Sequence, residues 1–224
     1  MKSSKPSASR LPPARLETQA DLKRAIAKVV KQDPRLRTIL AATGMPALRR
    51  RDPGFAGLAQ IVVGQQLSTA SANAIWNRMS EAFDPFHQDS IRGATAARLG
   101  KLGLSAAKIK TLKLLAAEIR SKRLDLEALG ELDADEAHKI LTALHGVGPW
   151  TADVYLLFCL GHTDAWPAGD LALQDAVRLG LNLDSRPGTK AMTALAEIWR
   201  PYRGAAAHLW WAYYRAARTS TKIL

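Results

Sequence analysis

The sequence is short of cysteine, of acidic residues and of long apolar runs. Its single cysteine, Cys159, rules out an internal disulfide, a Cys-ligated zinc site and a four-Cys iron–sulfur cluster, and we expect it to be a small buried side chain. No run approaches the roughly 18 consecutive apolar residues of a membrane span, and no apolar segment suits a secretion signal. The sequence therefore predicts a protein that does not interact with membranes.

Acidic residues are scarce in only one half of the chain. The sequence holds 32 Lys and Arg against 20 Asp and Glu, which gives a formal net charge of +12 and a pI near 10.1. Residues 1–112 contain 19 basic and 7 acidic residues, whereas residues 113–224 contain 13 of each. This excess indicates a polyanionic partner such as DNA, although it also serves plain solubility. In the second half, backbone amides and a few arginines would have to hold that partner.

Strand-like alternation is also missing, and apolar residues recur at helical spacing. Residues 1–17 are rich in Ser, Pro, Lys and Arg and predict a disordered basic tail, followed by one domain over residues 18–224. The predicted fold is all-α, with two helical lobes. We expect helices after Thr18, Gly54, Ser68, Ser105 and Asp133, from Pro149 to about Leu160, from Asp170, from Thr189, and from Gly204 to about Arg218.

The segment Leu144-His145-Gly146-Val147-Gly148-Pro149-Trp150-Thr151-Ala152 joins two of these helices. A tight Gly-x-Gly turn exposes backbone N–H groups at the start of the second helix, where the helix dipole also favours an anion. Pro149 suits the first helical position, because its missing N–H costs nothing there. The segment predicts a helix-hairpin-helix that holds a phosphate, although such a turn can also be an ordinary connector.

A lone carboxylate, Asp170, stands about 20 residues beyond the hairpin at the expected start of a helix. Its ordinary role there is to cap the helix. Capping and catalysis are compatible, because a helix N-terminus keeps a carboxylate ionised. Asp153, Asp164 and Asp175 are the nearby competitors. We expect Asp153 to orient local structure, and Asp164 and Asp175 to lie on solvated faces.

Two glutamines, Gln65 and Gln66, stand at a helix-to-helix junction, followed by Leu67 and Ser68. Glutamine is a poor core residue and a poor cap, but its amide can hydrogen-bond the bases of an opened duplex. The alternative is a solvent-facing loop. A further junction, Leu102-Gly103-Leu104-Ser105, and the segment Trp199-Arg200-Pro201-Tyr202-Arg203 complete the informative motifs. For Arg200 and Arg203 we favour a structural role over contact with DNA.

Taken together and in this order, these motifs resemble the helix-hairpin-helix DNA glycosylases, and most closely the 3-methyladenine DNA glycosylase II group that repairs alkylated bases. The resemblance covers about residues 20–218. It implies two helical lobes with a DNA-binding cleft between them, a hairpin that grips the DNA strand, and a catalytic aspartate at Asp170. It also implies a compact form without the N-terminal β-domain of some members.

The same resemblance assigns further roles residue by residue. The base pocket would fall on Trp150, Trp211 and Tyr155, and the wedge that fills the gap in the duplex on Gln66 or Leu67. A relative's pocket tyrosine aligns with Val154. In some relatives hairpin carbonyls bind a monovalent cation, here those of Leu144 and Gly146; otherwise no cofactor is expected. DNA contacts are expected at Gly146, Val147, Gly148, Thr151, Gln65, Gln66, Leu67 and Ser68. We expect Trp76, Trp166 and Trp199 in the core, and leave Trp210 open.

The expected activity is hydrolysis of the N-glycosidic bond of an alkylated purine, a cationic base that aromatic faces attract. Bifunctional members carry a lysine at the position of Trp150, and no lysine occurs between Lys139 and Lys190. The prediction is therefore a monofunctional enzyme acting on damaged double-stranded DNA as a monomer, in the cytoplasm or nucleoid of a bacterium or the nucleus of a eukaryote. The alternatives are a non-catalytic DNA-binding protein and a glycosylase for deaminated or etheno bases.

Overall fold

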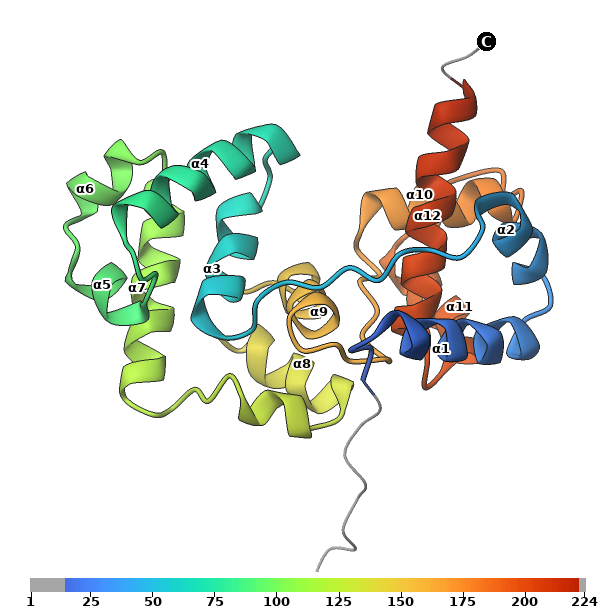
Figure 1. Cartoon of the computed structure of the whole chain (residues 1–224), viewed down its shortest axis with the longest axis horizontal. Coiled ribbons are helices and arrows are strands. Elements are labelled where there is room, and N and C mark those ends of the chain that lie inside the picture. The colour runs from blue at the N-terminus through green and yellow to red at the C-terminus, as the bar shows by residue number, and fades with distance from the viewer. Residues whose placement is uncertain (1–14, 222–224) are drawn as a thin grey trace, which may run out of the picture.

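The computed structural model describes residues 15–221, which form twelve α-helices arranged in two lobes (Figure 1). One lobe combines the two ends of the described chain and the other is continuous in sequence. Within residues 15–221 the only β-type pairing is an isolated bridge between Arg15 and His162. The all-α prediction is confirmed.

The lobe that combines both ends is built around the last helix, against which the first two helices and α10 pack. Its helices are α1 (Gln19–Gln32), α2 (Leu36–Thr43), α10 (Leu171–Gly180), α11 (Thr189–Ala196) and α12 (Arg203–Thr221). A short 3₁₀ turn, η2 (Glu197–Trp199), precedes α12.

The continuous lobe is built around α7, which packs on α3, α5 and α6. Its helices are α3 (Gly54–Gly64), α4 (Thr69–Ala82), α5 (Gln88–Gly93), α6 (Ala96–Lys101) and α7 (Ala106–Arg120). The chain therefore starts in one lobe, crosses to the other along residues 44–53, and later returns (Figure 1).

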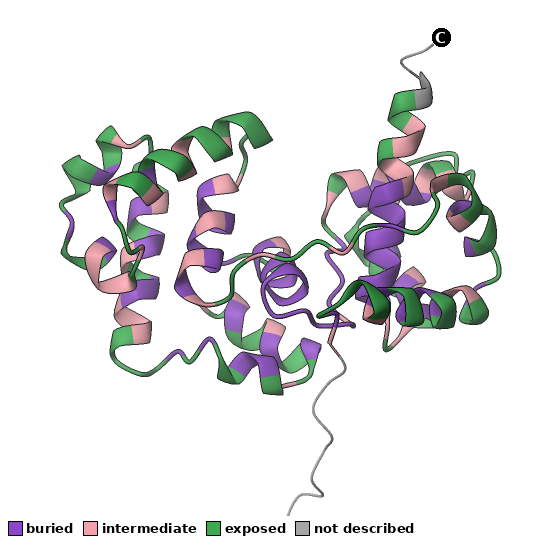
Figure 2. Cartoon of the chain, viewed as in Figure 1, coloured by how far each residue is buried: buried purple, intermediate pink, exposed green. Residues whose placement is uncertain are grey.

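Two helices, α8 (Ala134–Thr142) and α9 (Pro149–Phe158), lie between the lobes, after the 3₁₀ turn η1 (Ala128–Glu131). Every residue from 151 to 160 is buried, and Figure 2 shows α9 buried nearly all round at the centre of the molecule. A helix that is apolar on all sides is stable only when other elements surround it. The two lobes thus share a core that contains α9.

The helix starts follow the predicted capping chemistry. Thr18 and Asp21 form a reciprocal capping box, and Ser68, Ser105 and Asp133 each accept a backbone N–H of the first turn that follows. The predictions missed α2, α5 and α6, which have six to eight residues each. So short a helix offers too few apolar positions for a 3.6-residue period to stand out.

The predicted tail needs a correction at its end. Its residues 1–14 lie outside the described part of the chain, but Arg15 and Leu16 contact residues far along the chain. Leu16 is fully buried and its N–H donates to Gly161 O at 2.7 Å, while Arg15 pairs with Glu131 at 2.6 Å. A buried leucine and a paired arginine give these residues contacts that their composition does not reveal.

Candidate active site

The hairpin turn between α8 and α9 has the geometry of an anion site. Gly146 adopts φ +76°, and a Cβ there would lie within 3 Å of the Thr111 side chain, so only glycine fits. Gly148 is the N-cap residue of α9 and Pro149 its first residue. The first helical bond runs from Ala152 N to Gly148 O, which leaves the N–H groups of Trp150 and Thr151 without an acceptor inside the helix. These groups, at the positive end of α9, can hold a phosphate.

Gln65 ties the junction between α3 and α4 to this hairpin. Its Nε2 donates to Gly146 O at 3.1 Å and to Thr151 Oγ1 at 2.9 Å. The solvent-loop alternative is therefore wrong for Gln65. Because the Gln65 amide nitrogen is engaged and the Thr151 side chain is buried, both side chains hold the hairpin in place. Their predicted contacts with DNA would then fall to Gln65 Oε1 and the backbone N–H of Thr151.

Lys108 stands in the first turn of α7, where a lysine side chain ordinarily extends into solvent. Its Nζ instead donates to Val63 O at 2.7 Å and Gln65 O at 2.9 Å, at the end of α3. Burial lowers its pKa. A cation at the C-terminal end of a helix is favourable, because it binds carbonyls that have no helical partner. Sequence gives no signal for this contact, since 43 residues separate Lys108 from Gln65.

Beyond Gln65 the junction projects into solvent. Gln66 has φ +55° and is exposed, and the Leu67 side chain is 40% exposed. Ser68 uses its hydroxyl to cap α4, where it accepts from Ser71 N at 3.2 Å. Gln66 and Leu67 therefore remain the two candidates for the wedge, and the Ser68 side chain has a structural role.

Asp170 lies at the centre of the site, and three N–H groups converge on its carboxylate. Oδ2 accepts from Trp150 Nε1 at 2.8 Å, and Oδ1 accepts from Trp211 Nε1 at 3.1 Å. Oδ1 also accepts from Leu173 N at 2.9 Å, so Asp170 is the N-cap of α10 as predicted. Neutral N–H donors fix the orientation of the carboxylate and, unlike a paired arginine, do not cancel its charge.

A cavity of about 500 Å³ opens beside this carboxylate. The hairpin, the glutamine junction and the start of α10 all contribute to its walls. Its lining is Gln65, Gln66, Gly148, Pro149, Trp150, Thr151, Gly169, Asp170, Leu171 and Ala172. The structure thus brings together six of the thirteen predicted site residues in this lining, from segments about 85 and 20 residues from one another.

Two predicted pocket residues are not part of this lining. Tyr155 is fully buried, and its hydroxyl accepts from Gly54 N at 3.1 Å, so it belongs to the core. Trp211 is 8% exposed and packs on Phe158, with ring centroids 5.3 Å apart. We therefore correct both assignments: Tyr155 supports α3, and Trp211 supports Asp170 through its N–H. Both face inward because their helices are packed on every side at these positions.

The remaining tryptophans expected in the core are found there, with Trp76 half-buried against it. Trp166 donates to Met192 O at 3.1 Å and Trp199 to Asp33 at 3.0 Å. Trp210, left open by the sequence, is also fully buried.

Asp164 does not lie on a solvated face, which is a second correction. It accepts from Arg200 at 2.8 Å and from Arg203 at 2.9 Å, and Asp135 binds the same two arginines. The structural role expected for Arg200 and Arg203 agrees with this geometry. Asp175 lies 3.7 Å from Arg186 and is partly exposed.

Asp153 faces a second cavity, of about 410 Å³, on the other side of Trp150. Burial raises its pKa to about 8. His138 Nε2 lies 3.7 Å from its Oδ1, and burial lowers the pKa of that histidine. A carboxyl group that is neutral at physiological pH cannot stabilise a developing cation, so Asp153 is a poor competitor for the role predicted for Asp170.

The two carbonyls expected to hold a cation are at the hairpin turn. Leu144 O accepts from Val147 N at 3.2 Å and Gly146 O accepts from Gln65. Each carbonyl oxygen has a second lone pair, so both could still coordinate an ion. Among residues 15–221 no group of three His, Cys, Asp or Glu side chains is arranged to hold a metal ion. In that same part of the chain, no helix combines the length and apolar character needed to cross a membrane.

Comparison with known proteins places this geometry in context. A family model described as HhH-GPD superfamily base excision DNA repair protein matches residues 59–201. A probable bifunctional transcriptional activator/DNA repair enzyme AlkA of Mycobacterium tuberculosis is 33% identical over 83% of this chain. The chain spans 39% of that relative's length.

Two solved structures share the fold over nearly their whole length. The Schizosaccharomyces pombe 3-methyladenine DNA glycosylase Mag1, in complex with abasic DNA, aligns with a TM-score of 0.75 and 29% identity over 84% of this chain and 95% of its own. A DNA-3-methyladenine glycosidase of Bacillus halodurans aligns with a TM-score of 0.78 and 26% identity over 95% of each chain.

Proposed function

The chain belongs to the HhH-GPD superfamily of base excision DNA repair proteins, and from this premise we propose that it is a monofunctional DNA glycosylase that excises alkylated purines such as 3-methyladenine and 7-methylguanine. The names of the fission-yeast and Bacillus halodurans proteins support this substrate class. The observation that carries the proposal is the carboxylate of Asp170, which two indole N–H groups orient at the edge of an open cavity next to the hairpin.

Access to the base requires that the nucleotide leave the helical stack. The amide N–H groups of Trp150 and Thr151 would hold a backbone phosphate, while Gln66 or Leu67 fills the gap in the duplex. The cavity of about 500 Å³ has room for a purine. Trp150 lines it and offers an aromatic face to a cationic base, an attraction of about 0.5–2 kcal/mol.

Cleavage breaks the bond between C1′ of the sugar and the base nitrogen, and the bonding electrons leave with the base. An alkylated purine is already cationic, so it departs neutral and needs little acid catalysis. The sugar then carries positive charge, which the Asp170 carboxylate stabilises. Water adds to C1′ and loses a proton, and Asp170 is placed to accept a hydrogen bond from that water.

The reaction should stop at an intact abasic site. Strand cleavage by a bifunctional enzyme needs an amine that forms a Schiff base with C1′. Trp150 stands where those enzymes carry a lysine, and the segment from 140 to 189, which forms the hairpin and the Asp170 loop, contains none. We propose that the protein acts as a monomer on damaged double-stranded DNA and requires no cofactor. It would act where the DNA lies, in the cytoplasm or nucleoid of a bacterium or in the nucleus of a eukaryote. A monovalent cation on the Leu144 and Gly146 carbonyls would serve only to rigidify the hairpin.

A lesion panel tests the proposal. Purified protein is incubated with duplexes carrying methylated, deaminated or etheno bases; the free base is quantified, and strand nicking is scored before and after alkali. We expect release of methylated purines, with nicks only after alkali. Release of the other lesions alone would shift the specificity, while nicking without alkali would contradict the monofunctional assignment. Binding without any release would favour a non-catalytic DNA-binding protein.

A further inference from the structure

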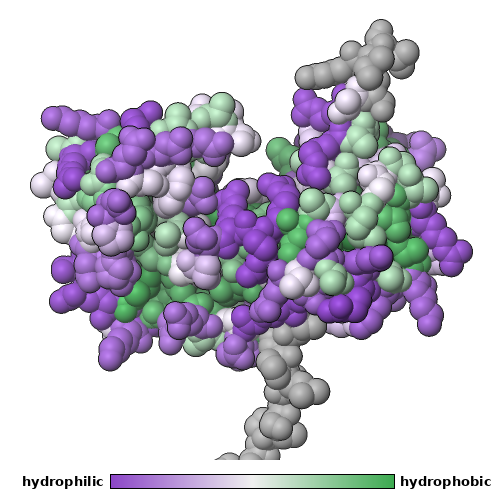
Figure 3. Space-filling model, viewed as in Figure 1, coloured by the Kyte–Doolittle hydropathy of each residue, from purple (hydrophilic) through white to green (hydrophobic). Residues whose placement is uncertain are grey.

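The inter-lobe linker, residues 44–53, carries three consecutive arginines across the face of the molecule. Figure 1 shows it running from α2 to α3 in front of α9, and Figure 3 shows hydrophilic side chains gathered on the middle of this face. The linker has no helix or strand of its own. Its position is nevertheless fixed by contacts with α1 and with the end of α9.

Backbone and side-chain hydrogen bonds pin the linker. Gln19 of α1 donates to Pro46 O at 2.9 Å and accepts from Leu48 N at 2.7 Å. Arg51 N donates to Phe158 O at 2.9 Å, and the Arg50 guanidinium donates to Cys159 O at 3.3 Å. The linker backbone is therefore held in place before any partner arrives, which lowers the entropic cost of binding.

Arg49 and Arg51 differ from the arginines of the core in having no carboxylate partner. Neither forms an ion pair with any residue in the range 15–221, and the same is true of Arg215 on α12. Arg203, by contrast, binds two aspartates. Burial and the positive charges of Arg215 and Arg51 lower the pKa of Arg49, and only Asp170 acts in the opposite direction.

The position of these cations relates them to the reaction site. The Arg49 guanidinium lies 5.0 Å from the centre of the Phe158 ring, and that ring packs on Trp211, which donates to Asp170. Arg51 lines a small cavity of about 220 Å³ together with Trp150 and Leu67. Arg49 and Arg51 thus border the same two tryptophans that orient the carboxylate, and Arg215 lies one helical turn after Trp211 on α12.

We propose that Arg49, Arg51 and Arg215 form a second phosphate site, which takes a DNA phosphodiester next to the extruded nucleotide. Three like charges without a carboxylate partner, two of them on a linker whose backbone is held in place, favour an anion between them, and the inference rests on the proposed function for the choice of DNA as its source. A guanidinium pairs well with phosphate oxygens. The hairpin amides and this site would then hold the backbone at two points, one on each side of Asp170.

The salt dependence of binding tests the proposal. The probe is a fluorescent duplex with a stable abasic-site analogue, titrated by anisotropy between about 50 and 300 mM salt. The variants are Arg49→Gln, Arg51→Gln and Arg215→Gln. Each lost phosphate contact should lower the slope of log affinity against log salt by about 0.9. Arg49→Lys keeps the charge and should keep the slope.

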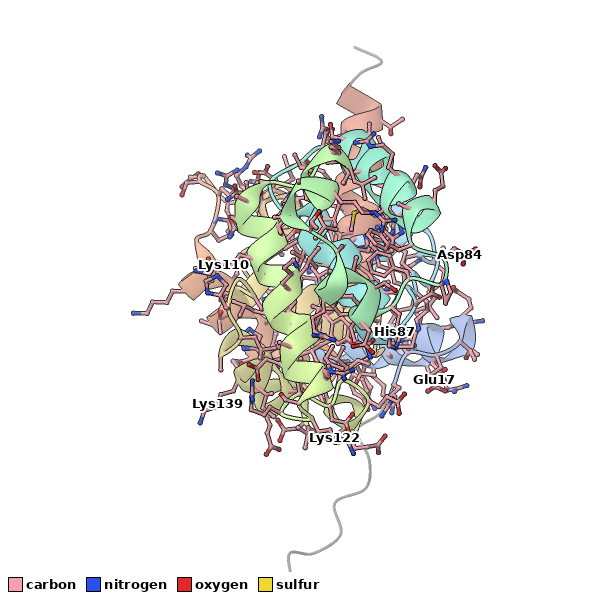
Figure 4. The ribbon with its side chains drawn as sticks, turned by 90° about the vertical axis from the view of Figure 1, so that its left-hand side faces the viewer. Glu17, Asp84, His87, Lys110, Lys122 and Lys139 are labelled. Atoms are coloured by element: carbon pink, nitrogen blue, oxygen red, sulfur yellow. The ribbon has the colours of Figure 1, made fainter. Side chains whose placement is uncertain are left out.

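Lys139→Gln is the matched control, because it removes one positive charge from an exposed residue on α8, labelled at the surface in Figure 4. Its slope should equal that of the wild type. The Arg51 and Arg215 variants should also melt at or above the wild-type temperature, because they remove repulsion and break no ion pair, whereas Arg49→Gln also gives up the contact with the Phe158 ring. A folded Arg49→Gln protein with an unchanged slope, or a Lys139→Gln protein with the same loss, would overturn the site.

The outcome is separable from that of the proposed reaction. Base release by the wild type is measured on its own with the lesion panel. Altered slopes without base release would support the phosphate site and refute the glycosylase. Base release by the wild type, together with unaltered salt slopes in the arginine variants, would support the glycosylase and refute the phosphate site.

Discussion

Asp164 and Asp170 lie on one loop, six residues apart, and end in opposite chemical settings. Asp164 binds two arginines, one of them buried, so its charge is neutralised within the protein. Asp170 is held by two indoles and a backbone amide, all of them neutral. Both carboxylates are well hydrogen-bonded, so hydrogen bonding alone does not separate a structural carboxylate from a reactive one. What separates them is the charge of the donors, which is positive at Asp164 and zero at Asp170.

Removing the Asp170 charge should give the largest effect. Asn retains the capping oxygen for Leu173 N, so Asp170→Asn should fold like the wild type. The transition-state cation would lose its counter-charge, and we expect single-turnover base release to fall about 10³-fold or more. Binding to an abasic duplex serves as the control and should persist. A variant with full activity would mean that another group stabilises the sugar.

Breaking the Asp164 setting should cost stability instead of catalysis. Arg203→Met leaves Asp164 and Asp135 with only Arg200, and we expect the free energy of unfolding to fall by about 3–5 kcal/mol, measured with urea. Arg200→Met is the matched control: its side chain is 37% exposed, so its loss should be near 1 kcal/mol. Equal losses for the two variants would show that burial of Arg203 is not what makes it important.

Asp153 is a third kind of carboxylate, a buried one that lies 3.7 Å from His138 Nε2, beyond hydrogen-bond distance. Its pKa of about 8 lies above the unfolded value of 3.8, so the folded protein keeps a proton that the unfolded chain gives up, and stability falls as pH rises through this window. Asp153→Asn removes that dependence. The variant should nearly match the wild type near pH 4 and exceed it by about 3 kcal/mol near pH 6, because each pH unit above the unfolded pKa costs the wild type about 1.4 kcal/mol.

The difference in unfolding free energy between Asp153→Asn and the wild type isolates the contribution of Asp153. Burial lowers the pKa values of His138, His162 and His208, which makes stability rise with pH between about 4 and 6.5. These histidines are present in both proteins, so their contribution largely cancels. Urea unfolding at several pH values provides the measurement. A constant difference across the range would refute the buried, neutral carboxyl group.

The smallest effect is expected for the donors of Asp170. Trp150→Phe keeps an aromatic face in the cavity but removes the N–H that binds Oδ2. A hydrogen bond to a charged acceptor contributes about 1.5–3 kcal/mol, part of which water replaces in an open cavity. We expect base release to slow about 10-fold with little change in abasic-site binding. Loss of binding instead would assign Trp150 to DNA contact.

Local chemistry was what the sequence predicted best. The caps at Thr18, Ser68, Ser105 and Asp170 depend only on residues one turn away, and all four are present. The hairpin likewise follows from Gly146 and its neighbours. Such features need no knowledge of the rest of the fold.

What the sequence could not reveal are contacts between distant segments. Arg203 and Asp164 are 39 residues apart. The direction in which the Tyr155 and Trp211 side chains face depends on neighbours from distant segments of the chain. The family resemblance assigned Trp211 to the base pocket, but it did not show that the Trp211 N–H donates to the Asp170 carboxylate. Packing decides which atoms of a side chain make a contact, and a sequence motif does not contain that information.

The burial of α9 has a mechanical consequence. Separating the two lobes would expose the apolar sides of α9 to water and would break the hydrogen bonds between Gln65 and the hairpin turn. Both consequences cost free energy. We therefore expect a stiff body whose amide grip and carboxylate keep a constant spacing. The DNA duplex must then deform to fit this fixed spacing. A damaged nucleotide, whose extrusion from the stack costs less free energy, meets this requirement more readily than an intact one.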